Sequence, residues 1–203
     1  MRFDSQSPHL ACYDTDRPKN DRELYYRLID GYTVSGRATG SDPLGTYQAL
    51  LYWKLYSQPA AIANLAKWMT VGSEMRRSAA SDLPRLLTSL PAALDRSVDA
   101  VVKTVQLLDT FQLPGMRSTS AIPVRTTFLH FIYPSTVPVF DRMVLQAVGV
   151  DQPDANHSYT VLREYLPFAW KLADQYAERT SVGYREQTLR LIDMALWVNR
   201  GRR

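Results

Sequence analysis

Apolar residues recur at intervals of three and four along most of the chain, a period typical of helices that bury one face. The pattern is clearest after Pro91, where it includes Leu94, Val98, Val101, Val105 and Leu108. β-branched residues nowhere alternate with polar ones for long, so no strand is predicted. The sequence therefore predicts an all-α protein.

Residues that begin or end helices divide this pattern into nine segments. Asp42 and Pro43, for example, supply an N-cap and a first-turn proline, and Gly31 is expected to end the first helix. The predicted helices cover residues 20–32, 43–56, 59–69, a segment from about 82–84, another from 91, then 122–132, 141–148, 159–179 and 184–199. The polar stretch around Arg76 and Arg77 is expected to precede the fourth helix.

The 203 residues suit one domain, or two small lobes around a shared core. A hydrophobic fraction of 45% is too high for a disordered chain. The net charge of +4 is mildly basic, which favours a polyanionic partner without requiring one.

Cysteine and histidine usage argues against metal chemistry. Cys12 is the single cysteine, and the three histidines lack the spacing of a zinc site, so neither a metal nor a cofactor is expected. The N-terminus has no apolar signal segment and no apolar run reaches membrane-spanning length. We expect a cytoplasmic monomer that does not contact membranes.

Residues 106–145 combine a helix, a Leu113-Pro114-Gly115 turn, a second helix and a proline-rich loop that ends at Asp141. A Pro-Gly turn exposes backbone amides with little side-chain bulk, which suits a phosphate oxygen. No acidic residue lies between Leu113 and Phe140, around Arg117 and Arg125, so the local field is expected to be positive.

The strings "LPGM" and "VPVFD" resemble the helix–hairpin–helix DNA glycosylase superfamily. "FLHFIYPSTVPVFD" and the closing "RLIDMALW" are similar to a bacterial branch related to oxoguanine DNA glycosylases. This resemblance implies a two-lobed, all-α glycosylase-like fold, with the hairpin and the Asp loop within residues 106–145. Two departures are present: Met116-Arg117 stands where the family has Val-Gly, and one residue is inserted before Asp141.

The resemblance also implies a role for Asp141 as the catalytic carboxylate. Cleavage of an N-glycosidic bond builds positive charge on the sugar, which a fixed carboxylate stabilises, and the same group can orient or deprotonate the attacking water. The alternative is that Asp141 only caps the helix that follows it. Both roles are compatible, because capping fixes the rotamer and favours the ionised form.

Relatives that also cut the strand use a hairpin lysine, which forms a Schiff base with the sugar. This chain has no lysine between Lys103 and Lys171, and Arg125, nearest that place, stays protonated. The expected activity is therefore monofunctional base excision that leaves an abasic site in double-stranded DNA. A retaining carbohydrate glycosidase is not favoured, since no second carboxylate joins Asp141 in this segment.

Other candidates have two interpretations each. Arg142 is expected to contact the DNA backbone or to pair with a carboxylate. His130 is expected to reach phosphate or Asp141, or simply to be a packed helix histidine. In "YQALLYWKLY", Tyr52 and Trp53 could stack on an extruded base and Lys54 could hold its phosphate, unless this is an amphipathic core helix.

The hairpin itself supplies the remaining DNA-binding candidates, which are Pro114, Gly115, Met116 and Arg117. The base could be an oxidised purine, or a modified pyrimidine such as a phage cytosine in a defence role. Two other classes stay open: a catalytically inactive helical DNA-binding protein, and a helical interaction protein without a nucleic-acid role.

Overall fold

The computed structural model describes residues 19–34, 42–55, 58–116, 121–177 and 188–199. Its α-helices are α1 (Lys19–Ile29), α2 (Pro43–Leu55), α3 (Pro59–Trp68), α4 (Glu74–Ser89), α5 (Val98–Leu107), α6 (Ile122–Ile132), α7 (Arg142–Ala147), α8 (Tyr159–Ala177) and α9 (Thr188–Asn199). A π-helix, Asp30–Val34, follows α1, and short 3-10 helices cover Leu108–Thr110 and Ala155–His157. These described segments contain no strand, which confirms the all-α prediction for them.

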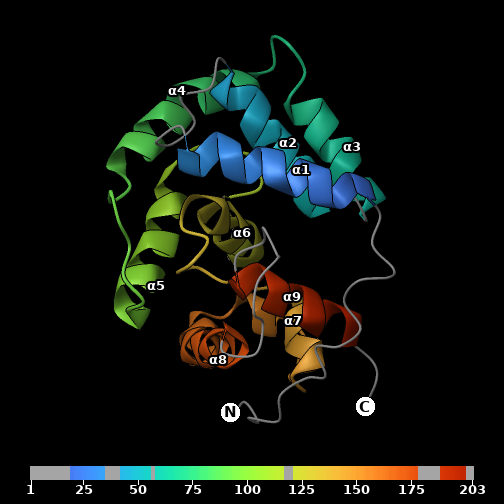
Figure 1. Ribbon diagram of the computed structural model, residues 1–203. Coiled ribbons are helices and arrows are strands. Elements are labelled where there is room, and N and C mark those ends of the chain that lie inside the picture. Colours follow the sequence, from blue (N-terminus) through green and yellow to red (C-terminus); the bar gives the residue numbers. More distant parts are fainter. Residues whose placement is uncertain (1–18, 35–41, 56–57, 117–120, 178–187, 200–203) are drawn as a thin grey trace.

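Helix α6 lies at the centre of the molecule. Helices α1 to α4 gather on one side of it and α7, α8 and α9 on the other (Figure 1). Every residue of α6 is buried. One continuous hydrophobic core extends from Tyr25 on α1 to Leu196 on α9, so both groups of helices share the apolar surface around α6.

Several helix boundaries agree with those predicted from local sequence signals. Helix α6 covers the predicted residues 122–132. Helix α2 begins at Pro43, and the carboxylate of Asp42 accepts a hydrogen bond from the Gly45 amide at 2.8 Å, as an N-cap does. Helix α7 begins directly after Asp141.

Three predicted boundaries were wrong: the end of the first helix and the starts of the fourth and fifth. The first helix does not stop at Gly31, because the backbone continues through the π-helix. The fourth begins at Glu74 rather than near residues 82–84, since the Ser73 hydroxyl caps it by accepting from the Arg76 amide at 3.2 Å. Pro84 then lies inside α4, where a helix tolerates one missing amide when its apolar face is buried.

The fifth helix begins at Val98, not at Pro91. Two carbonyls of the intervening segment accept tertiary hydrogen bonds: Pro91 from the Tyr133 hydroxyl at 2.5 Å, and Leu94 from the Thr136 hydroxyl at 2.8 Å. These contacts hold the segment in an irregular conformation, and Ser97 then caps α5. The periodic pattern before residue 98 was therefore not helical.

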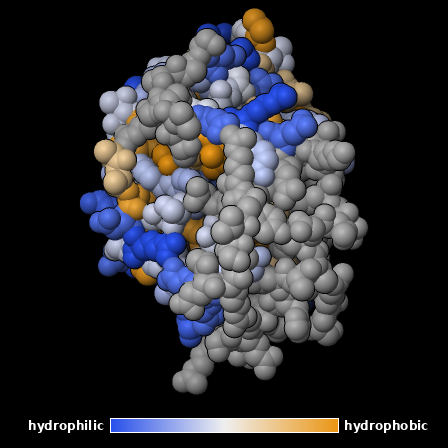
Figure 2. Space-filling view, viewed as in Figure 1, coloured by the Kyte–Doolittle hydropathy of each residue, from blue (hydrophilic) through white to orange (hydrophobic). Residues whose placement is uncertain are grey.

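The described part of the face in Figure 2 is mostly hydrophilic, with hydrophobic residues in separate patches. Among the described helices, none has the length and apolar character needed to cross a membrane. Helix α8, with 19 residues, contains Arg163, Glu164 and Lys171 within its span.

Candidate functional site

The segment Leu113–Met116 forms a tight turn between the 3-10 helix after α5 and the chain that leads to α6. The Met116 amide donates to the Leu113 carbonyl at 3.1 Å, and Gly115 has φ of +77°. A type II turn requires a positive φ at its third position, which glycine supplies, and it favours proline at the second. The Tyr47 hydroxyl of α2 donates to the Pro114 carbonyl at 2.6 Å, which fastens the turn to the core.

Replacing Gly115 with Ala should lower the unfolding free energy by about 1–2 kcal/mol. The new Cβ would have to adopt a positive φ and would lie 3.3 Å from Leu51 Cδ2. Gly72→Ala is the matched control, since Gly72 has φ of +85° with no atom within 4 Å of the added Cβ. Urea unfolding should show a larger loss of unfolding free energy for Gly115→Ala than for Gly72→Ala. Equal losses would mean that the close contact with Leu51 does not destabilise the variant.

Arg125 does not project from the protein as a phosphate ligand, contrary to the prediction. Its guanidinium is 1% exposed. It donates to the Met116 carbonyl at 2.8 Å and to the Tyr159 hydroxyl at 2.8 Å, and it pairs with Asp109. An acidic partner 16 residues away in sequence therefore neutralises it, and its role is to join the turn to α6 and α8.

The loop between α6 and α7 is buried from Thr136 to Phe140, which is unusual for a connection. Side chains from other elements satisfy its backbone: Trp170 donates to the Thr136 carbonyl at 2.7 Å, and Tyr165 to the Val139 carbonyl at 3.4 Å. The Phe140 amide donates to the hydroxyl of Thr126 at 3.3 Å. These bonds fix the backbone that delivers Asp141.

His130 belongs to this support and does not reach phosphate. It is completely buried, and its Nδ1 lies 2.8 Å from the Val137 carbonyl, so Nδ1 bears the proton. Its Nε2 therefore accepts from the Tyr25 hydroxyl at 2.9 Å. Burial lowers the pKa of His130 to about 4, which keeps the ring neutral at physiological pH.

His130→Gln should remove one pH-dependent part of the stability. The unfolded chain protonates this histidine near pH 6.5 and the folded protein only near pH 4, so wild-type unfolding free energy falls by about 3 kcal/mol as the pH drops through that window. Above pH 6.5 the contribution is fully present. Urea unfolding at pH 7.5 and 4.5 should show that the difference in unfolding free energy between wild type and variant becomes smaller at low pH. A difference that does not change with pH would contradict the assigned pKa of His130.

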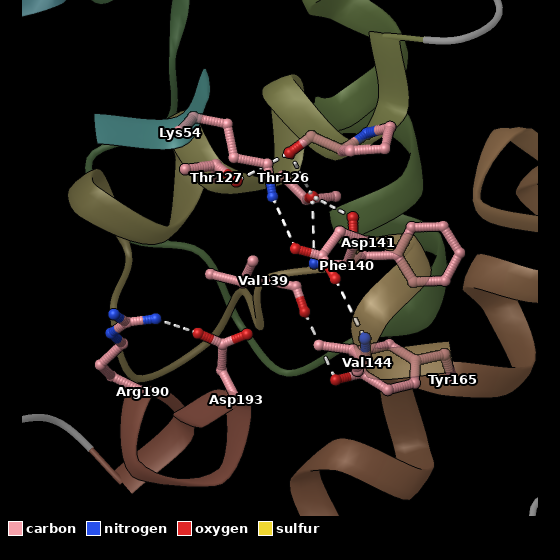
Figure 3. Close-up of polar contacts among 11 residues, drawn as sticks. Lys54, Thr126, Thr127, Val139, Phe140, Asp141, Val144, Tyr165, Arg190 and Asp193 are labelled. Atoms are coloured by element: carbon pink, nitrogen blue, oxygen red, sulfur yellow. Dashed lines mark hydrogen bonds and ion pairs between the residues drawn. The ribbon is translucent and has the colours of Figure 1, made fainter. Parts of the chain in front are cut away.

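Asp141 is held by two groups from different elements (Figure 3). One carboxylate oxygen accepts from the Val144 amide at 3.0 Å and thereby caps α7; the other lies 2.9 Å from the Lys54 ammonium on α2. Burial tends to raise the pKa of Asp141, but the Lys54 charge and these hydrogen bonds outweigh it and lower the pKa below its usual value. The carboxylate is 23% exposed, so an ionised acid with a fixed rotamer remains open to solvent.

A second carboxylate, Asp193 on α9, faces the same site and was missed in the sequence. It pairs with Arg190, and its side chain is 6% exposed (Figure 3). Burial raises the pKa of Asp193, and the charge of Asp141 raises it further, against the opposing effect of Arg190. A lone Asp within the apolar run "RLIDMALW" was the available signal.

The predicted site residues on α2 lie in three different environments. Lys54 pairs with Asp141 and does not project as a phosphate ligand. Trp53 is buried against Arg190 and Phe131, so it is not a stacking surface for a base. Tyr52 is 53% exposed, but two residues before Lys54 it lies about 160° around the helix from that side chain.

In the hairpin, Pro114 and Met116 are buried, so only the partly exposed Gly115 remains accessible there; Arg117 lies outside the described residues. Arg142 is exposed at the start of α7, and no described residue forms an ion pair with it.

The described residues contain no group of three His, Cys, Asp or Glu side chains that could hold a metal ion. Comparison with known protein families finds no matching family model, and no curated protein or solved structure matches the chain.

Proposed function

We propose that the protein is a monofunctional DNA N-glycosylase that hydrolyses the bond between a damaged or modified base and its sugar. The observation that carries this proposal is the Asp141 carboxylate. It is ionised, held at a buried and hydrogen-bonded loop end, and still 23% exposed. A carboxylate fixed in this way costs no reorganisation when positive charge develops on a sugar beside it.

The reaction follows from that placement. As the bond to the base breaks, the sugar gains oxocarbenium character, and the Asp141 charge lowers the energy of that state. Asp141 also orients a water and accepts its proton as the water adds to the anomeric carbon. The base leaves with the bonding electron pair, and the DNA keeps an abasic site.

Two accessible groups support contact with a DNA strand. Arg142 is exposed beside Asp141 at the N-terminus of α7, where it can contact a phosphate. The Pro114-Gly115 turn offers a second backbone contact through the partly exposed Gly115. The target nucleotide would leave the duplex to reach Asp141, at an unstacking cost of a few kcal/mol.

Base release from a panel of duplexes tests the proposal. The panel includes oxidised purines, damaged pyrimidines and phage DNA with hypermodified cytosines, and alkali is used to cut abasic sites. Alkali-dependent cutting at one modified base would support the proposal and identify the substrate. Salt-sensitive DNA binding without cutting would favour a catalytically inactive DNA-binding protein. If the protein does not bind DNA at all, a helical interaction protein without a nucleic-acid role is favoured.

Borohydride should trap no covalent adduct between the protein and DNA that contains an abasic site. Lys54 is the amine nearest to Asp141 among the described residues, and as the cation of an ion pair it has no lone pair for attack. The products should therefore remain uncut until alkali is added. An adduct that maps to Lys54 would contradict the monofunctional assignment.

A further inference from the structure

A second ion pair, Arg190 with Asp193 on α9, is buried in the same region as the Asp141–Lys54 pair (Figure 3). The two side chains are 7% and 6% exposed. Taking two charges out of water costs several kcal/mol per ion before their attraction is counted, and apolar residues of similar volume are often at least as stabilising. Stability alone is therefore a weak explanation for this pair.

The pair contacts the helix that positions Lys54. The Arg190 guanidinium packs over the Trp53 ring, 4.7 Å from its centroid, and over the Tyr25 ring at 5.1 Å. Trp53 directly precedes Lys54 on α2 and is itself buried. Asp193 fixes Arg190 and Arg190 packs on Trp53, so the α9 pair constrains where the Lys54 ammonium lies.

Charges from three elements face Asp193. Arg190 comes from its own helix, Asp141 from the start of α7, and Lys54 from α2. Tyr165 on α8 is a further titratable neighbour, and burial together with the charges of both carboxylates raises the pKa of its hydroxyl. The Arg190 charge also contributes to the lowered pKa of His130 on α6. Two cations and two carboxylates therefore form one cluster, which we call the four-charge cluster: Lys54, Asp141, Arg190 and Asp193.

We infer that Arg190 and Asp193 are a positioning pair of the Asp141 site, which holds Lys54 against Asp141 and couples the Asp193 charge to that of Asp141. Asp193 matters electrostatically because it offsets the second cation of the four-charge cluster. Without Asp193, two cations would face a single carboxylate, and a positively charged sugar would meet net repulsion. This consequence for catalysis rests on the proposed function, whereas the coupling between the two carboxylates does not.

Carboxyl-carbon NMR titrations of wild type, Asp141→Asn and Asp193→Asn test the coupling without any substrate. Asp141→Asn should lower the titration midpoint of Asp193, because it removes a negative neighbour. Asp193→Asn should leave the midpoint of Asp141 nearly unchanged, because Asp193, whose pKa is raised, is already protonated and neutral when Asp141 titrates. Asp82→Asn is the matched control: Asp82 is another buried, ion-paired carboxylate, on α4, and its loss should shift neither midpoint.

Base release supplies the second measurement. Asp193→Asn should lower kcat with little change in KM, because Asp193 is buried and does not touch substrate. An unshifted Asp193 midpoint in Asp141→Asn, or an Asp193→Asn enzyme with wild-type kcat, would overturn the inference. If Asp193→Asn does not fold, the Asp193 midpoint in Asp141→Asn still decides it. A shifted Asp193 midpoint in a protein that releases no base would defeat only the proposed function.

Discussion

Asp141→Asn should reduce base release by about 10²- to 10³-fold, the usual cost of removing one preorganised electrostatic group. The amide has nearly the same shape as the carboxylate but no charge, so it cannot stabilise a positive sugar or accept a proton from water. Single-turnover cutting of the identified substrate, followed by alkali, measures the effect. DNA affinity should change far less, because phosphate contacts come from other residues.

The fold should survive this substitution. Asn is as good an N-cap as Asp, so the bond to the Val144 amide is retained. The lost interaction with Lys54 should lower the unfolding free energy by about 1–2 kcal/mol.

Asp82→Asn is the control for a buried acid outside the site. Asp82 pairs with Arg85 at 2.8 Å and accepts from the Gln112 amide at 2.7 Å. This variant should lose stability on a similar scale and keep wild-type base release. Equal loss of activity in both variants would assign the Asp141 effect to general destabilisation and remove the main support for catalysis.

The second large effect should separate two arginines that the sequence grouped together. Arg125→Met should lower the unfolding free energy by about 2–4 kcal/mol, because the buried Met116 carbonyl and the Tyr159 hydroxyl lose their partner. The paired Asp109 is 56% exposed, so water screens that part of the interaction. Arg142→Gln should change stability by less than about 0.5 kcal/mol, since Arg142 is exposed.

Their effects on DNA binding should be the reverse. Arg142→Gln should reduce the slope of log affinity against log salt by about one, as expected when one phosphate contact is lost. Arg125→Met should leave that slope unchanged at temperatures where it remains folded. Titrations of labelled duplex over a range of salt, with urea unfolding of the same preparations, would test both statements. A slope reduced by Arg125→Met would mean that the guanidinium leaves its buried position when DNA binds.

The sequence alone predicted those features that depend on neighbours within a few residues. The helical period located α6, Asp42 was identified as a cap, and the Pro-Gly pair identified the turn before α6. Asp141 was also recognisable as a helix cap at a proline-rich junction. Each of these rests on hydrogen bonds or apolar contacts that span three or four positions, so a short stretch contains the necessary information.

Only the tertiary structure decided the partners of the charged groups. Lys54 meets Asp141 across 87 residues, and Asp193 joins them from the last described helix. The same is true of the Pro91–Arg96 segment, whose helical pattern yields to hydrogen bonds from residues some 42 positions away. Such contacts depend on how the helices pack around α6, and a periodic pattern specifies which face of a helix is buried but not which helix covers it.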